Sequence, residues 1–203
     1  MAGTFAVLGA LSFFPTKNLG AAGDAGMVLS TDDALGGRVR MLRAHGSVRR
    51  YLHDRVGVNS RLDALQAAVL SVKLPYLDAW SAKRRERAAG YSRRLRDAAL
   101  DPRWVRVPED AGEAHVFHQY VIRAEQRDEL RDALGAHEIE TQIYYPLPFP
   151  LQPCFEPLGF RSGEFPEAER ASRQCLALPI YPEITDGQLD HVVDTIAAFY
   201  QRR

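Results

Sequence analysis

Cysteine is nearly absent from this chain of 203 residues, in which only Cys154 and Cys175 occur. Two cysteines with no Cys or His close by are too few for a disulfide framework, so both are predicted to be buried thiols. No stretch approaches the roughly 18 consecutive apolar residues that a membrane helix needs. The apolar residues 1–11 lack the basic segment that opens a signal peptide. These absences favour a soluble, cytoplasmic protein that does not associate with membranes.

An excess of charge of one sign is also missing, because 26 Lys and Arg face 26 Asp and Glu and the net charge is zero. Composition therefore gives no argument for nucleic acid as a partner. Hydrophobic residues make up 46% of the chain, which is ordinary for a globular protein and excludes a disordered tail. The length allows one large domain or two small ones.

Lysine is the rarest basic residue, with only three among the 26. Lys83 lies among arginines, where it is expected to stay an ordinary cation, and Lys73 lies late in an amphipathic helix. Lys17 instead follows Phe13-Phe14-Pro15 and precedes a run of glycine and alanine. Apolar surroundings disfavour an ammonium and make the free amine nucleophilic, so Lys17 is the best candidate for Schiff-base chemistry. An exposed, inert lysine at a hairpin tip explains the same pattern equally well.

The first half of the chain is predicted to hold a strand at 9–15, a glycine-rich turn and a second strand at 27–30. Thr31 or Asp32 can cap a helix that runs to about residue 44. A polar loop follows over 47–60. A helix begins near residue 62, is interrupted at Pro75 and continues to about residue 100.

The composition changes after residue 100, and a domain boundary is placed near residues 100–103. Strands and helices alternate beyond it, which is typical of a small α+β domain. The expected elements are strands at 104–107, 115–124 and 139–145, an apolar edge segment at 176–181, and helices at 127–136, 166–176 and 185–200. His115 and His118 face opposite sides of a strand in this scheme, so no metal site is predicted.

Residues 83–96 carry seven basic residues and one acid, Glu86. Such a run indicates a solvated helix face or a basic surface near an anionic ligand, and the pattern alone leaves both open.

Several segments together carry a resemblance to a known family. The residues from Ser12 to Gly26 closely resemble the lysine segment of the DegT/StrS family of PLP-dependent sugar aminotransferases, which are fold type I enzymes related to aspartate aminotransferase. Further family-like segments follow in family order and extend the resemblance over essentially all 203 residues. They are Arg43-Ala-His45-Gly46, 56–68 with Asn59 and Gln66, His115-Val-Phe-His118-Gln-Tyr120, Tyr145-Pro146-Leu-Pro148, Phe165–Arg170 and Leu178-Pro179.

The resemblance implies an α/β fold that corresponds to the C-terminal part of such an enzyme. Residues 1–100 would be part of the large PLP-binding domain with a long interdomain helix, and residues 101–203 the small α+β domain. Family members are roughly twice as long, and their N-terminal half carries the phosphate-cradling turn, a ring-stacking aromatic and the Asp that pairs with the pyridine nitrogen. This chain by itself is therefore expected to be catalytically incomplete.

The resemblance also implies roles for three residues. Lys17 would form the Schiff base with pyridoxal 5'-phosphate and then move protons as general base and acid. Ser12 would contact the PLP phosphate, and Asn59 would reach the PLP phosphate of a neighbouring subunit, which implies a dimer. Without the family, Ser12 is simply a small strand residue and Asn59 a turn residue before a helix. Arg61 is expected to pair with a phosphate or with Asp63.

The function implied is transfer of an amino group from an amino acid such as glutamate to a nucleotide-diphosphate keto-sugar. Lys17 argues against the dehydratase branch of the family, whose members replace this lysine. The partner is expected to be a second copy or a complementing N-terminal chain, because the strands at 9–15 and 27–30 leave an apolar edge. The alternative is a catalytically incomplete chain that acts as a partner or regulatory subunit, or a gene remnant.

Overall fold

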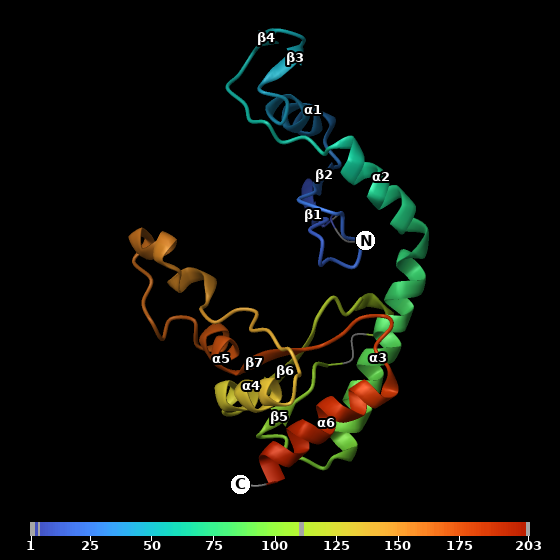
Figure 1. Cartoon of the computed structure of the whole chain (residues 1–203). Helices are drawn as coiled ribbons and strands as arrows, with labels where there is room; N and C mark the ends of the chain where they lie inside the picture. The colour runs from blue at the N-terminus through green and yellow to red at the C-terminus, as the bar shows by residue number, and fades with distance from the viewer. Residues whose placement is uncertain (1–2, 4, 110–111, 202–203) are drawn as a thin grey trace. The chain divides into compact units, whose positions relative to one another are not determined.

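The computed structural model describes residues 3, 5–109 and 112–201 (Figure 1). The chain divides into two compact units, Met1–Asp78 and Ala79–Arg203, and the division falls inside a helix. Within the described ranges, no helix is long and apolar enough to cross a membrane.

The N-terminal unit begins with the predicted strand pair. Strand β1 (Leu8–Ser12) runs antiparallel to β2 (Gly26–Ser30), with Leu8 opposite Ser30 and Ser12 opposite Gly26. Residues 13–25 form the loop between them, so the predicted order of strand, glycine-rich turn and strand is confirmed. Lys17 lies in this loop.

Helix α1 (Asp33–Leu42) begins at the predicted cap, because the Oδ1 of Asp32 accepts the Leu35 N–H at 2.9 Å. The segment 47–60 was predicted to be a loop, and this is wrong for its first part. Strands β3 (Ser47–Arg49) and β4 (Leu52–His53) pair there as a short antiparallel hairpin. Gly46 permits the entry: its φ is +72°, and a Cβ would lie 1.7 Å from the Arg55 carbonyl oxygen.

Helix α2 (Ala64–Lys73) ends where Pro75 removes a backbone donor, and a 3-10 turn, η1 (Leu74–Tyr76), leads into α3 (Leu77–Asp97). The interruption predicted at Pro75 is therefore confirmed.

The C-terminal unit is built on a three-stranded antiparallel sheet in the order β5-β6-β7. Its strands are β5 (Val105–Arg106), β6 (Tyr120–Ala124) and β7 (Cys175–Leu178), and its helices beyond α3 are α4 (Arg127–Ala136), α5 (Pro166–Gln174) and α6 (Asp186–Gln201). Three short 3-10 turns complete it: η2 (Gly112–Ala114), η3 (Phe149–Leu151) and η4 (Pro153–Leu158).

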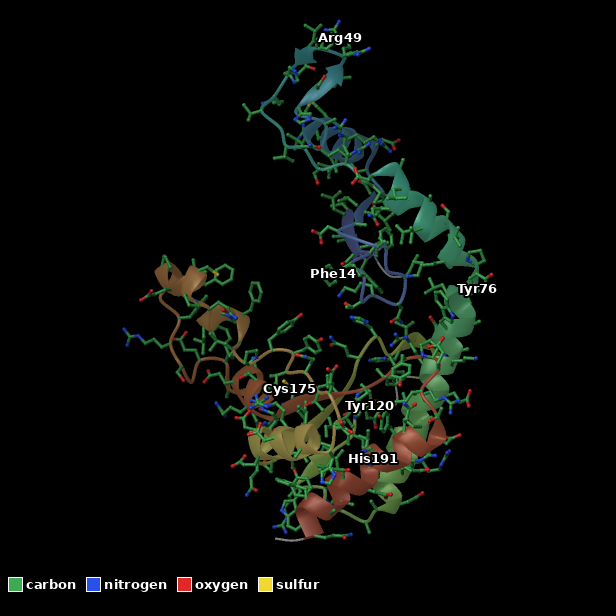
Figure 2. The ribbon with its side chains drawn as sticks, viewed as in Figure 1. Phe14, Arg49, Tyr76, Tyr120, Cys175 and His191 are labelled. Atoms are coloured by element: carbon green, nitrogen blue, oxygen red, sulfur yellow. The ribbon has the colours of Figure 1, made fainter. Side chains whose placement is uncertain are left out.

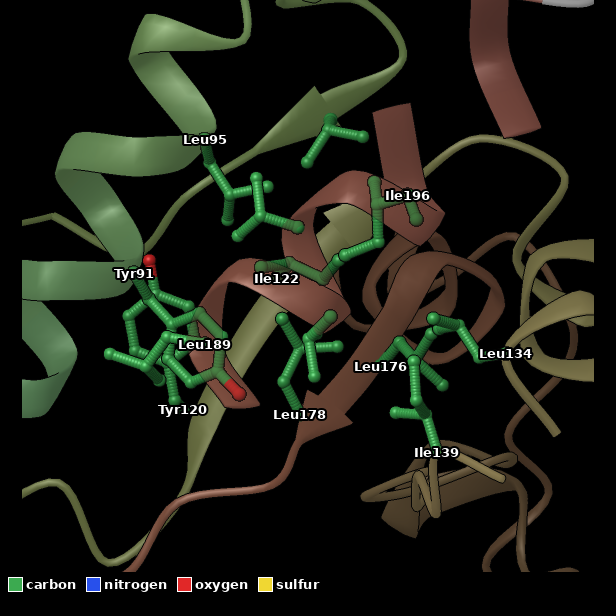
Figure 3. Packing of buried hydrophobic residues seen from close by; sticks show 14 of the residues in the cluster. Tyr91, Leu95, Tyr120, Ile122, Leu134, Ile139, Leu176, Leu178, Leu189 and Ile196 are labelled. Carbon is green, nitrogen blue, oxygen red and sulfur yellow. The ribbon is translucent and has the colours of Figure 1, made fainter. Parts of the chain in front are cut away.

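The core of this unit gathers side chains from α3, the sheet and α6 (Figure 3). Tyr91 and Leu95 of α3 are buried there beside Tyr120 and Leu189. The division into units consequently lies well before the boundary expected at residues 100–103, because the second half of α3 buries its apolar face with the sheet.

Two predicted strands in this unit are corrected. The strand expected at 115–124 begins only at Tyr120, because side chains occupy the backbone groups before it: His115 Nδ1 accepts the Phe117 N–H at 2.9 Å. The strand expected at 139–145 is reduced to one bridge between Gln142 and Ala177. The prolines that follow at 146 and 148 cannot donate to a ladder.

The two cysteines differ from each other. Cys175 is buried, as predicted, at the start of β7 (Figure 2). Cys154 is exposed, so its predicted burial is wrong. It lies in η4, a 3-10 turn with the three-residue neighbour η3 before it, and η4 buries none of its residues.

Candidate active site

Lys17 stands in a loop that closes upon itself. The Phe13 N–H donates to the Ala25 carbonyl at 2.8 Å, and the Ala21 N–H donates back to the Phe13 carbonyl at 2.8 Å. Nearer the tip, the Lys17 N–H donates to the Phe14 carbonyl at 2.8 Å. The loop is therefore a compact backbone structure that carries Lys17 on its outer turn.

Gly20 makes this closure sterically feasible. A Cβ at this position would lie 2.3 Å from the Pro15 carbonyl oxygen, so the two arms of the turn approach more closely than any side chain allows. Gly20 and Ala21 are buried at the base of the turn, while Lys17 is half-buried above them.

Ser12 ends β1 immediately before this loop. Its Oγ accepts the Phe14 N–H at 3.3 Å, and the side chain is exposed. A hydroxyl that accepts in this way keeps its own proton available for donation to a ligand. Lys17 bonds Phe14 through its backbone N–H and Ser12 bonds it through its hydroxyl, so the structure ties both predicted site residues to the same residue of the loop.

Two side chains of α2 hold the same loop, and sequence reasoning assigned no site role to either. The Gln66 Oε1 accepts the Ala22 N–H at 2.8 Å, and the Lys73 Nζ donates to the Gly20 carbonyl at 2.5 Å. Their spacing of seven residues places both on one face of the helix. That spacing was the available signal, although nothing in the sequence indicates that this helix face is directed toward the Lys17 loop.

Asn59 lies elsewhere in the N-terminal unit. It forms an isolated bridge with Ala44, and its Oδ1 accepts from the Nε of Arg61 at 3.4 Å. Arg61 is thus bonded to Asn59, and no ion pair with Asp63 is found among the described residues. Its pairing with a phosphate stays a prediction. For the residues that the structure describes, no hydrogen bond joins Asn59 to Ser12 or Lys17.

Helix α1 contacts both β2 and β3. In Figure 1, α1 lies between the β3–β4 hairpin and the β1–β2 pair. Arg49 marks this hairpin and Phe14 the lysine-bearing loop (Figure 2). A role for Asn59 at the lysine of its own subunit is not suggested by this placement.

Two basic residues of the arginine-rich helix α3 bind other parts of the C-terminal unit. Arg84 Nη1 donates to three carbonyls, those of Phe117, His118 and Ile180, at 3.1, 3.3 and 3.0 Å. Arg94 binds Asp186 at 2.9 Å and also pairs with Asp190. Neither a solvated face nor a ligand surface describes these two residues, which support the fold.

A cavity of about 300 Å³ lies along another face of α3, where its lining includes Arg85, Ser92, Arg96 and Phe117. It contains none of the predicted site residues. Within the described part of the chain, no group of three His, Cys, Asp or Glu side chains is arranged to hold a metal ion.

Comparison with known proteins decides the family. A sequence profile of the DegT/DnrJ/EryC1/StrS aminotransferase family matches residues 1–197. The chain belongs to this family. A pleiotropic regulatory protein of Geobacillus stearothermophilus is 51% identical to it, with 94% of this chain and 51% of that protein covered. The dTDP-3-amino-3,4,6-trideoxy-alpha-D-glucose transaminase of Streptomyces venezuelae is 41% identical, with 95% of this chain and 50% of that enzyme covered.

Solved structures of the DegT/DnrJ/EryC1/StrS family share the fold. The crystal structure of S. venezuelae DesV in complex with a ketimine intermediate superposes with a TM-score of 0.88 at 41% identity, covering 97% of this chain and 52% of that chain. The chain thus has the α/β fold of the C-terminal part of a PLP-dependent sugar aminotransferase, as predicted. It spans about half the length of the curated relatives it matches.

Proposed function

We propose that this chain supplies the lysine-bearing part of an aminotransferase that moves an amino group from an amino acid such as glutamate to a nucleotide-activated keto-sugar. The observation that carries the proposal is the closed loop in which Lys17 and Ser12 share the backbone of Phe14. Family membership supports the reaction class. The name of the Streptomyces transaminase supports the substrate class.

The donor set at this loop suits pyridoxal 5'-phosphate. Lys17 offers a primary amine for the aldehyde, and the Ser12 hydroxyl offers a donor for a phosphate oxygen. Asn59 offers an amide donor, which we assign to the phosphate in a partner subunit because it lies apart from Lys17 in its own. When bound, PLP supplies an electron sink for the carbon from which a proton is removed.

Lys17 performs the proton transfers in this proposal. With PLP bound, the Lys17 Nζ would take the proton from the Cα of the amino donor as a general base. When the amino group passes to the sugar, the same Nζ would give a proton to the former keto carbon as a general acid. Ser12 and Asn59 keep the phosphate in place while these protons move, which holds the reacting carbon beside Nζ.

The partner in this proposal is a second copy of this chain or a chain that provides the N-terminal half of the family fold. The exposed apolar side chains of the strand pair support it. Leu8 is 40% exposed and Val28 is 49% exposed, so the pair leaves apolar surface for another polypeptide to cover.

Covalent trapping tests the role of Lys17. The protein is mixed with PLP, reduced with borohydride and mapped by mass spectrometry, which is simple because only Lys17, Lys73 and Lys83 can react as side chains. We expect label on Lys17 and its loss in Lys17→Arg. Preferential label on Lys73 or Lys83 would remove the basis of the proposal.

A regulatory role is the second candidate, and one observation favours it: the relative with 51% identity is named a pleiotropic regulatory protein. One assay distinguishes the aminotransferase from the regulatory subunit. The chain is combined with the N-terminal half of a family member, and glutamate and a nucleotide keto-sugar are supplied. Amino-sugar formation that depends on Lys17 supports the enzyme, whereas stable association without turnover supports a regulatory subunit.

A further inference from the structure

We propose that Gln66 and Lys73 are positioning residues that hold the loop 13–25 against α2 and thereby fix where the Lys17 amine stands. This rests on the role proposed for Lys17. Neither side chain is offered as a catalytic group, because the hydrogen bond that each makes goes to the backbone of the loop.

The two contacts form a pair of anchors on one helix face. Seven residues correspond to about two turns of α-helix, or roughly 10 Å along the axis. The anchored groups, the Gly20 carbonyl and the Ala22 N–H, are only two residues apart in the loop. One anchor donates and the other accepts, so together they fix both the position and the direction of this stretch of backbone.

These backbone groups depend on α2 for their partners. The pairing of β1 with β2 ends at Ser12 and Gly26, so the sheet ladder does not reach residues 20 and 22. Gly20 is buried, and a buried carbonyl without a donor is costly. The Lys73 ammonium meets this need with a charge-assisted bond.

In the described part of the chain, the Lys73 ammonium is engaged by the Gly20 carbonyl. No ion pair with a carboxylate is found for Lys73 among the described residues, and its Nζ donates a hydrogen bond to the Gly20 carbonyl. An ammonium engaged as a donor cannot at the same time act as a free amine. The same contact that anchors the loop therefore leaves Lys17 as the lysine of this unit that is available for a carbonyl.

The anchors act on Lys17 through the closed turn. The bond of Lys17 N–H to Phe14 and the tight passage of Gly20 against Pro15 connect the tip of the loop to its base. With residues 20 and 22 fixed on α2, the closed turn that carries Lys17 is attached to the helix at its base. Loss of either anchor should let the second arm of the loop move away and carry the Lys17 amine with it.

The test compares disruptive variants with conservative ones. Lys73→Met and Gln66→Leu put an apolar side chain of similar size at each position and remove the polar contact. Lys73→Arg keeps a cationic donor, and Gln66→Glu keeps the accepting oxygen. Val72→Met is the matched control, because it introduces the same side chain at the neighbouring position, which is 71% exposed.

Three readouts are taken on the full chain. Hydrogen exchange follows the Ala22 amide, methylation by formaldehyde and cyanoborohydride reports the reactivity of Lys17, and trapping with PLP and borohydride reports a productive amine. Lys83 is the internal reference for both labels. We expect Lys73→Met and Gln66→Leu to speed exchange at Ala22 about tenfold. We also expect methylation of Lys17 relative to Lys83 to rise at least threefold. Trapping of PLP on Lys17 relative to Lys83 should fall.

The outcomes separate this inference from the function on which it rests. Return of all readouts to the original values in Lys73→Arg and Gln66→Glu, with no change in Val72→Met, supports positioning. Unchanged methylation of Lys17 in both disruptive variants overturns it, even if exchange at Ala22 is faster. If PLP never labels Lys17 in the unaltered chain while methylation still responds to the anchors, the proposed function fails and the positioning stands.

Discussion

At the scale of single residues, Tyr120 shows how burial controls an ionisable group. Its ring stacks on Tyr91 with centroids 5.0 Å apart, and its hydroxyl lies 2.8 Å from the Ser92 Oγ. Burial raises the pKa of Tyr120 to about 12, although the hydrogen bond from Ser92 opposes the rise. The phenol is thus kept neutral inside the core that joins α3 to the sheet.

This pKa predicts a loss of stability at high pH. An unfolded tyrosine loses its proton near pH 10, whereas Tyr120 in the folded chain holds it to about 12, so the free energy of unfolding falls across that window. Tyr120→Phe should make the fall shallower, and the slope that remains belongs to Tyr91, whose pKa burial also raises. Urea unfolding at steps of pH from about 9 to 12 measures this. An equally steep fall in Tyr120→Phe would contradict the assignment.

At the scale of elements, the loop 13–25 depends on the one glycine that lets its arms touch. Gly20→Ala would place a Cβ 2.3 Å from the Pro15 carbonyl oxygen, so the turn has to open. We expect trapping of Lys17 by PLP to fall about tenfold or more, because a displaced reacting group loses rate steeply.

The matched control is Gly37→Ala in α1, where an added Cβ meets nothing within 4 Å. Alanine is the better helix former there, so this variant should gain roughly 0.5–1 kcal/mol and keep its labelling of Lys17. Equal labelling of the Gly20→Ala and Gly37→Ala chains, measured by peptide mapping, would show that the closed turn does not matter to the amine.

Elements with local signals were predictable from the sequence. Asp32 caps α1, Pro75 interrupts the long helix, and α4 occupies residues 127–136 as expected, because caps, prolines and helical periodicity act over a few residues. The hairpin at 47–53 was not predicted. It depends on the positive φ of Gly46 and on the close approach of the Arg55 backbone to this glycine, and neither is visible in the local sequence. Strand β6 starts late because the nearby His115 takes the Phe117 N–H and the distant Arg84 takes the carbonyls of Phe117 and His118, and the second contact is not visible in the local sequence.

The residues of the candidate site also differ in whether local sequence could reveal them. Lys17 and Ser12 are close in sequence, and the segment that holds them was recognisable. The partners of the loop, Gln66 and Lys73, lie about 50 residues away, so only the tertiary contact reveals them. Whether Asn59 serves a neighbouring subunit stays a prediction.

At the scale of the whole molecule, the two units differ in how much apolar surface they bury. Among the described residues of the N-terminal unit, the buried apolar side chains are those of Ala21 and Leu70, whereas Phe5 and Val56 are 91% and 98% exposed. The C-terminal unit holds a continuous core with Tyr91, Ile122 and Ile196 fully buried. Stability should therefore reside in the second unit, and association in the first.

Truncation separates these two properties. A fragment of residues 79–203 keeps α3 with its core residues Ala88, Tyr91 and Leu95, so we expect a monomer that unfolds cooperatively. A fragment of residues 101–203 loses those side chains and the Arg84 clamp on three carbonyls, and the buried area it leaves open is worth several kcal/mol. We expect this shorter fragment to be unfolded or aggregated.

The full chain is expected to self-associate through the exposed strands and hairpin of its first unit unless another polypeptide covers them. Light scattering and urea unfolding of the 1–203, 79–203 and 101–203 polypeptides decide between these expectations. A cooperative 101–203 fragment would place the domain boundary after α3, where the change in composition predicts it. A monomeric 1–203 chain would mean that the first unit needs no cover, because its exposed side chains are too dispersed to bind another chain.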